Sequence, residues 1–212
     1  GSLDGVEGIR TVIENAKKNG RSFDYVIDAT HPFAKVISSN LKIACEKLNQ
    51  SFIRYERPLQ QTHHARLIKT LKEFENFDLR GKKILLAIGS RSLQEAFFYV
   101  QAAGGIAFAR VMPTVDGLLK SFSLTIPQEN IAVLKPLKGK PIGSLEAALC
   151  RRWKISGVVC RQSGGENERV WQSICKKDKI SLWLISRPPA PLAIHKAYTI
   201  NELIEKICFR YS

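Results

Sequence analysis

Residues 83–102 read KILLAIGSRSLQEAFFYVQA, an apolar run followed by a Gly-Ser-Arg turn and a helix-like stretch. The run at 83–88 predicts a buried strand, and the stretch at 92–102 predicts a helix. The same succession recurs to the end of the chain, with strands expected at 107–111, 131–134, 157–160 and 182–185 and helices at 115–122, 144–153, 168–176 and 200–209. Five strands that each precede a helix predict an all-parallel, doubly wound five-stranded sheet with helices on both faces.

The first 80 residues alternate in the same way, but less regularly. Helices are expected over 6–16 and 33–48, and strands at 25–27, 52–55 and 66–69, the last within a crossover region. Asn19-Gly20 is a suitable end for the first helix, and Pro32 suits the start of the second. We therefore predict an α/β protein of two Rossmann-like, parallel-sheet domains, residues 1–80 and 81–212, with a boundary near Gly81.

The chain carries a large surplus of positive charge. Its 212 residues include 33 Lys and Arg against 19 Asp and Glu, a formal net charge of +14 at pH 7. Residues 1–80 hold 13 basic and 10 acidic residues, a net of +3, and residues 81–212 hold 20 and 9, a net of +11. Such asymmetry indicates a polyanionic partner, which could be nucleic acid, a membrane surface or an acidic small molecule.

Several classes of protein are disfavoured by what the sequence lacks. There is no apolar run of about 18 residues or more, and the N-terminus lacks the apolar segment of a secretory signal. Five cysteines without a CxxC pair disfavour a disulfide framework or a zinc site and suit a reducing cytosol, so we expect a cytoplasmic protein without a metal. GxGxxG, Walker A and GxSxG patterns are also missing.

Polar residues at the carboxyl ends of the expected strands are the candidate site residues, because open parallel sheets bind ligands there. They form four clusters: DATHPFA at 28–34, RYERP at 54–58, IGSR at 88–91 with ARVMP at 109–113, and CRQSGGEN at 160–167. Arginines can bind carboxylates and phosphates bidentately, and the glycine turns can present N–H groups to an anion. Each cluster also has a simpler interpretation, as helix caps, a packed loop histidine, plain connecting turns and solvated arginines.

Taken together in this order, the clusters resemble the precorrin-6A reductase family, the NADPH-dependent reductases of corrin-ring (cobalamin) biosynthesis. The resemblance rests on DATHPFA, RYERP, IGSR and ARVMP at the positions above, on Ser163-Gly164-Gly165 and on Arg187-Pro188. This ordered set covers nearly the whole chain, and DATHPFA followed by RYERP is its specific part.

The resemblance implies that NADPH gives a hydride to a ring carbon of a polycarboxylate tetrapyrrole, converting precorrin-6A or its cobalt form to precorrin-6B. On this basis we expect His31 to be a catalytic residue that supports protonation of a ring nitrogen. The residues expected to bind the substrate are Thr30, Arg54, Arg57, Arg110 and Arg161. The residues expected to bind the cofactor are Gly89, Ser90, Arg91, Ser163, Gly164 and Gly165.

The chain departs from the family pattern in three places. The family normally begins with a strand, a Gly-Gly-Thr loop and a helix that hold the NADPH pyrophosphate, whereas Gly1–Gly5 here matches a point further inside, so we expect that segment to be missing. The family's Lys-Asp before the Ser-Gly loop is Arg161-Gln162 here. A Gly-Pro-Phe-Ser-like turn is altered at 139–144.

Two rival functions remain open on the sequence. The first is a tetrapyrrole-binding protein without reductase activity, because the pyrophosphate loop is expected to be missing. The second is a basic nucleic-acid-binding domain, although the arginines are not interleaved with aromatic residues as single-strand platforms require. The strand-end arginines favour a multiply carboxylated small molecule and a phosphate-bearing cofactor, with neither nucleic acid nor membrane as a partner.

Overall fold

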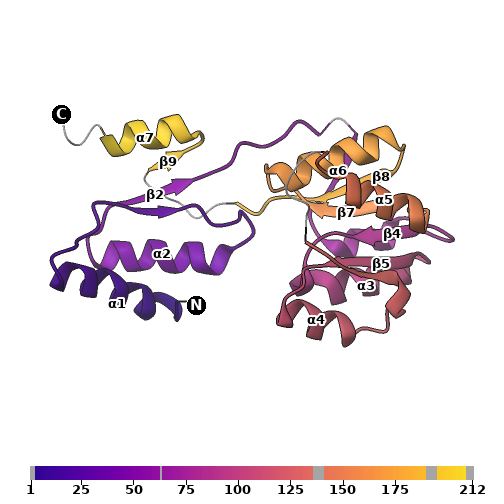
Figure 1. The fold of residues 1–212 in the computed structure, drawn as a ribbon, viewed down its shortest axis with the longest axis horizontal. Helices are drawn as coiled ribbons and strands as arrows, with labels where there is room; N and C mark the ends of the chain where they lie inside the picture. Colours follow the sequence, from indigo (N-terminus) through magenta and orange to yellow (C-terminus); the bar gives the residue numbers. More distant parts are fainter. Residues whose placement is uncertain (1–2, 63, 136–140, 190–194, 209–212) are drawn as a thin grey trace. The chain divides into compact units, whose positions relative to one another are not determined.

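The structure, a computed structural model, describes residues 3–62, 64–135, 141–189 and 195–208 (Figure 1). The chain forms two compact units. Unit 1 consists of Gly1–Leu59 and Arg187–Ser212, and unit 2 consists of Gln60–Ser186. Two expected features, the match at residues 1–5 and the turn at 139–144, lie partly outside the described residues.

These unit boundaries differ from the single boundary expected near Gly81. Residues 60–80 belong to unit 2, because strand β3 (Ala65–Ile68) pairs in parallel with β8 (Ser181–Ile185). Later the chain returns to unit 1, where β9 (Lys196–Ala197) pairs with β2 (Phe52–Tyr55). Unit 1 is therefore assembled from the two ends of the chain.

Unit 1 is a three-stranded parallel sheet in the order β1-β2-β9, in which β1 spans Val26–Asp28. Helices α1 (Gly5–Lys18) and α2 (Lys35–Lys47) lie on one face of this sheet, and α7 (Ile200–Cys208) lies on the other (Figure 1). The core under α1 and α2 consists of Ile9, Ile13, Ala44 and Cys45, with Val26 and Phe52 of the strands packed against it.

Unit 2 is a six-stranded sheet in the order β3-β8-β7-β4-β5-β6, with every pair parallel. Its other strands are β4 (Lys83–Leu86), β5 (Ile106–Val111), β6 (Ile131–Val133) and β7 (Gly157–Arg161). The five strands expected here are present, and the α/β, parallel-sheet class is confirmed. The number of strands was wrong by one, because β3 from the expected crossover adds an edge strand beside β8.

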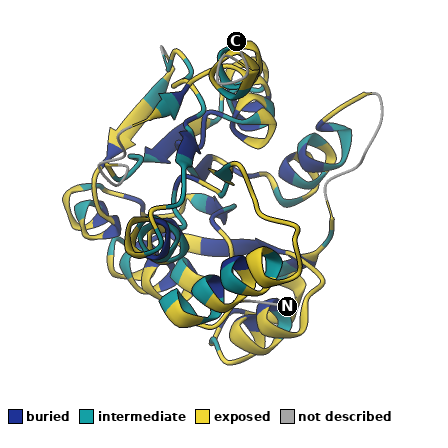
Figure 2. Cartoon of the chain, turned by 90° about the vertical axis from the view of Figure 1, so that its left-hand side faces the viewer, coloured by how far each residue is buried: buried dark blue, intermediate teal, exposed yellow. Residues whose placement is uncertain are grey.

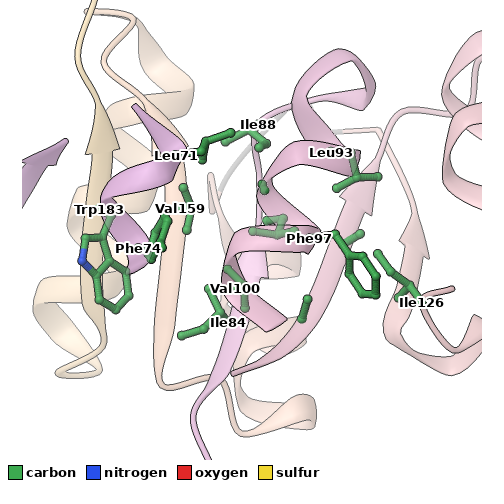
Figure 3. Packing of buried hydrophobic residues seen from close by; sticks show 14 of the residues in the cluster. Leu71, Phe74, Ile84, Ile88, Leu93, Phe97, Val100, Ile126, Val159 and Trp183 are labelled. Carbon is green, nitrogen blue, oxygen red and sulfur yellow. The ribbon is translucent and has the colours of Figure 1, made fainter. Parts of the chain in front are cut away.

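Helices cover both faces of the unit 2 sheet (Figure 1). The helical segments are η1 (Leu71–Asn76), η2 (Ser90–Ser92), α3 (Leu93–Ala102), α4 (Val115–Phe122), η3 (Gln128–Asn130), α5 (Ser144–Trp153) and α6 (Glu166–Lys177). One core joins η1 and α3 to the sheet through Phe74, Phe97 and Trp183 (Figure 3). The other core lies under α5 and α6 around the fully buried Trp171.

Residues within the central strands of unit 2, β4, β5, β7 and β8, are largely buried, whereas the outer faces of the helices are exposed (Figure 2). In β4, for example, Ile84 and Leu86 belong to one core and Leu85 belongs to the other, as the alternation of side chains along a strand requires. Among the described residues, none of the helices is both long and apolar enough to cross a membrane.

Candidate functional site

The carboxyl ends of β1 and β2 hold a buried network of charged groups in unit 1. Asp28 and Arg54 are paired in register and are 0% and 2% exposed. Nη1 of Arg54 donates to the Asp28 carboxylate and, at 2.8 Å, to Oγ of Ser38, while its Nε donates at 2.9 Å to Oε2 of Glu56. The backbone N–H and the hydroxyl of Thr30 donate to Oδ1 of Asp28 at 3.0 and 2.6 Å.

Hydrogen bonds keep this network charged although it is buried. Burial alone would raise the pKa of Asp28, but hydrogen bonds from Thr30, Ser38 and Arg54 outweigh it and lower that pKa. Burial likewise opposes the charge of Arg54, yet its two carboxylate partners leave its pKa raised. Arg187 completes the network by donating to Oε1 of Glu56 at 2.9 Å, so two guanidinium groups balance two carboxylates.

This network changes the interpretation of Thr30 and Arg54, which we expected to bind substrate. Arg54 is occupied by protein partners in the interior, and its contacts join the end of β1 at Asp28 to Ser38 on α2. Thr30 does not cap α2, since the N-cap of α2 is Ala34 and makes no side-chain cap bond. The helix begins at Lys35, after a turn at Pro32, because the Thr30 hydroxyl is already engaged with Asp28 and Ser38.

His31 and Arg57 lie nearer to solvent than Arg54. His31 is exposed, its ring lies 5.8 Å from that of Phe33, and its Nδ1 accepts the N–H of Phe33 at 3.3 Å. A ring that accepts at Nδ1 carries its proton on Nε2 when neutral, so His31 can donate from Nε2. Arg57 is half-buried, and its backbone carbonyl accepts a hydrogen bond from Arg187.

In unit 2, the turn after β4 brings two expected arginines together. Gly89 has φ of 80°, and a Cβ there would lie 3.9 Å from Nη1 of Arg161. Arg161 ends β7, the neighbour of β4, and its Nη2 donates to Oγ of Ser92 at 3.1 Å. Burial, followed by the positive charge of Arg91, lowers the pKa of Arg161. Two guanidinium groups that oppose each other's charge at a strand end favour an anion there.

Ser90, expected to contact the cofactor, is held by α4. Its hydroxyl donates at 3.2 Å to Oδ2 of Asp116. The pKa of Asp116 is lowered, mainly by Lys120 and also by Ser90 and Arg91. Ser90 therefore joins the turn to α4, and the positive charge of the turn resides on Arg91 and Arg161.

The loop from Ser163 to Gly165 does not form the open anion nest that its glycines suggest. The N–H of Gly164 donates at 2.7 Å to Oε2 of Glu168, which is fully buried, and the N–H of Gly165 points to Oγ of Ser163 at 3.4 Å. The carbonyl of Gly164 accepts from Nε2 of Gln60 at 3.0 Å. A carboxylate already occupies the position of the anion, so this loop does not fit a phosphate group.

Arg110, near the carboxyl end of β5, is 8% exposed. The ion pair that the structure gives it is with Glu146 in the first turn of α5, where Oε1 lies 3.5 Å from Nη2. Burial lowers the pKa of Arg110, and Glu146 opposes this only in part. Arg110 is thus a buried cation with little compensation.

Three functional neighbours were missed by sequence reasoning. Glu168 could have been found, because it stands three residues after Gly165, the N-cap of α6, where Glu commonly reaches back to free N–H groups. Ser38 and Glu146 gave no signal, since a single Ser or Glu on a helix is ordinarily a solvent-facing residue. Among the described residues, no cluster of three or more His, Cys, Asp or Glu could hold a metal ion.

Comparison with known proteins supports the resemblance. The profile of the family described as "Precorrin-6x reductase CbiJ/CobK" matches residues 1–207. A cobalt-precorrin-6A reductase of Synechocystis is 30% identical over 174 residues, which cover 79% of this chain and 64% of that protein. A precorrin-6A reductase of Mycobacterium tuberculosis is 26% identical over 210 residues, which cover 95% of this chain and 77% of that protein.

A solved structure of a CobK precorrin-6A reductase has a TM-score of 0.73 at 22% identity and covers 99% of this chain and 80% of its own. This likeness concerns the fold. The chain spans about two thirds of the length of the first curated relatives, 64% and 65%. The match along nearly all of its residues shows that the chain belongs to the precorrin-6x reductase family.

Proposed function

We propose that the chain acts as a precorrin-6A reductase, which transfers a hydride from NADPH to precorrin-6A or its cobalt form and yields precorrin-6B. The observation that carries this proposal is the family match over residues 1–207. Bound NADPH supplies the hydride. The protein's own residues bind and orient the two ligands and supply a proton to the macrocycle.

The turn Gly89-Ser90-Arg91 with Arg161 is our candidate for one anionic group of these ligands. The positive φ of Gly89 favours glycine, which has no side chain to block the turn, and the two arginines supply hydrogen-bond donors. A phosphate of NADPH suits Arg91, which is exposed, whereas Arg161 was expected to bind a substrate carboxylate. Because the two arginines are neighbours, we propose that they bind the same group.

Variants of these two arginines decide which ligand they bind. Arg91→Gln and Arg161→Gln should each raise a KM by about tenfold, the loss of a charge-assisted bond. If the KM for NADPH rises alone, the pair binds the cofactor, and if the KM for precorrin-6A rises alone, it binds the substrate. Arg152→Gln, an exposed arginine on α5, serves as the control. Unchanged KM values in both variants would contradict the assignment.

His31 is our candidate for a proton donor to the macrocycle. A donated proton makes a ring carbon of the conjugated system a better hydride acceptor. Loss of general acid catalysis in His31→Ala should lower kcat by about 10²-fold with little change in KM. His64→Ala, another exposed histidine, is the matched control. A kcat unchanged by His31→Ala would remove His31 from the reaction.

A second function, tetrapyrrole binding without reduction, is favoured by one observation. The N–H of Gly164 is occupied by Glu168, so the Ser163–Gly165 loop offers no cradle for the NADPH phosphates. A titration of the chain with NADPH, with and without precorrin-6A, separates the two functions. NADPH binding and turnover support the reductase, whereas tetrapyrrole binding without dinucleotide binding supports the second function.

A further inference from the structure

One edge of the Arg110 guanidinium group makes no hydrogen bond. Its Nε and Nη2 atoms are buried and make no hydrogen bond. These two nitrogens lie on the same side of the planar group, and together they form a fork that matches the two oxygens of a carboxylate or phosphate. Buried polar atoms nearly always have partners, so an intact, buried and unused fork requires an explanation.

Glu146 does not supply the missing partner. Its Oε1 lies 3.5 Å from Nη2 of Arg110, beyond the range of a good charge-assisted hydrogen bond, and Nε has no acceptor at all. Glu146 is itself only 2% exposed, so it provides a buried counter-charge for Arg110, while Nε and Nη2 remain without a hydrogen bond.

The surroundings of the fork include the core under α5 and α6 and the first turn of α5. Arg110 alternates with Ala109 and Val111 and shares its face of the sheet with Phe108, which packs in the core under α5 and α6. Glu146 lies in the first turn of α5, a helix of ten residues. The N-cap of α5 is Gly143, at φ of 82°, and makes no side-chain cap bond. The carboxylate of Glu146 lies in this first turn and offsets the partial positive charge of the helix N-terminus, so the attraction for an anion comes from the fork of Arg110.

We propose that Arg110 binds one oxyanion group of an acidic ligand through Nε and Nη2, with Glu146 as the positioning residue. This slot is separate from the turn at Arg91 and Arg161, because Arg161 follows the buried Cys160 of the α5–α6 core and faces Ser92 on the other side of the sheet. The identity of the ligand rests on the proposed function: a carboxylate of the tetrapyrrole or a phosphate of the dinucleotide offers the same pair of oxygens.

The test measures binding by calorimetry with three probes: uroporphyrin as a tetrapyrrole polycarboxylate, NADP+ and inorganic phosphate. Arg110→Lys keeps the positive charge but removes the fork, and Arg152→Gln is the exposed control on α5. We expect Arg110→Lys to lower the affinity for uroporphyrin or for NADP+ by about tenfold. Arg152→Gln should leave both affinities nearly unchanged. The probe whose affinity falls in Arg110→Lys identifies the source of the oxyanion. If only the affinity for inorganic phosphate falls, the site binds free phosphate, and the proposal that it binds the substrate or the cofactor is overturned.

A second measurement guards against a variant that fails to fold. In protein labelled with ¹⁵N, the Nε–H signal of Arg110, absent from Arg110→Lys, should shift when the effective probe is added. Glu146→Gln should reduce the affinity less than Arg110→Lys, because it removes no donor. Equal affinity of wild type and Arg110→Lys for all probes, or an Nε–H signal that does not move, overturns the proposal. Turnover with NADPH is measured separately, so an inactive chain with Arg110-dependent binding refutes the reductase and keeps the slot.

Discussion

Arg54 in unit 1 and Arg110 in unit 2 occupy equivalent places, near the carboxyl end of a parallel strand, and both are buried. Arg54 donates to Asp28, Ser38 and Glu56, and carboxylates neutralise its charge. Arg110 has one carboxylate at 3.5 Å from Nη2, and neither Nε nor Nη2 makes a hydrogen bond.

The difference between these two arginines is one of compensation, not of burial. A buried arginine whose donors are all hydrogen-bonded within the protein stabilises the fold. Its removal leaves buried carboxylates unpaired and destabilises the protein. A buried arginine with open donors costs stability until a ligand satisfies it. The two sites should therefore respond in opposite directions to the loss of the charge.

The largest effect is expected from Arg54→Met. The variant leaves Asp28 and Glu56 buried with one guanidinium instead of two, and breaking a buried network of this kind costs about 3–5 kcal/mol. All three tryptophans, Trp153, Trp171 and Trp183, lie in unit 2. Far-UV circular dichroism should show an earlier unfolding transition in urea, while the transition followed by tryptophan fluorescence stays in place. Coincident shifts in both signals, or no shift, would contradict a network local to unit 1.

Gly157→Ala should produce the reverse pattern. A Cβ at Gly157 would lie 2.3 Å from Cζ3 of Trp183 and 2.9 Å from Cδ1 of Ile84, both packed in the sheet of unit 2. Overpacking of a core costs roughly 1–3 kcal/mol. The fluorescence transition should move to lower urea, and the part of the dichroism signal that belongs to unit 1 should not move. A variant as stable as the wild type would show that the Trp183 ring can move aside.

Local features of the fold could be predicted from the sequence, whereas the pairing of distant segments could not. Helices α4 and α5 have the expected bounds, Val115–Phe122 and Ser144–Trp153, because helical spacing of apolar residues is a local signal. The pairing of β3 with β8, and of β9 with β2, joins strands that lie far apart in the chain, and no nearby residue specifies it. The division into units was misplaced for this reason.

The same limit applies to the candidate residues. The sequence places Arg54 and Arg110 at strand ends, but their partners Asp28 and Glu146 come from other elements, and only the packed structure reveals how many acceptors each arginine meets. For Gly164, the acceptor is Glu168 on the next helix, and it turns an expected anion nest into an internal hydrogen bond. The residue types in the sequence indicated where polar groups gather. Whether such a group is available to a ligand depends on the partners that the folded protein supplies, and the sequence does not show these.

Arg110→Met with Glu146→Gln should be neutral or stabilising by about 1 kcal/mol in the absence of an anion. The double variant removes a poorly paired buried charge and leaves no uncompensated carboxylate, and such replacements are often stabilising. Thermal unfolding followed by tryptophan fluorescence gives the measurement, without a probe and with uroporphyrin or NADP+. The probe that binds through Arg110 should stabilise the wild type more than the double variant. A clear loss of stability without the probe would show that Arg110 is as well compensated as Arg54.

The smallest effect is a pH dependence that belongs to unit 1. The folded-state pKa of Asp28 is lowered, since hydrogen bonds from Thr30, Ser38 and Arg54 outweigh burial, while the unfolded pKa stays near its usual value of about 3.9. The contribution of Asp28 is therefore fully present above about pH 4 and is lost as the pH falls below it, through the folded pKa. In Arg54→Met, Asp28 loses the hydrogen bond from Arg54, so its folded-state pKa moves up toward the unfolded value and the loss of stability on acidification becomes smaller. Arg110→Lys should leave this window unchanged, because Arg110 lies in unit 2 and has no part in the Asp28 network. Dichroism melts between about pH 3 and 6 compare the three proteins, and identical pH profiles for Arg54→Met and wild type would show that Arg54 does not set the charge of Asp28.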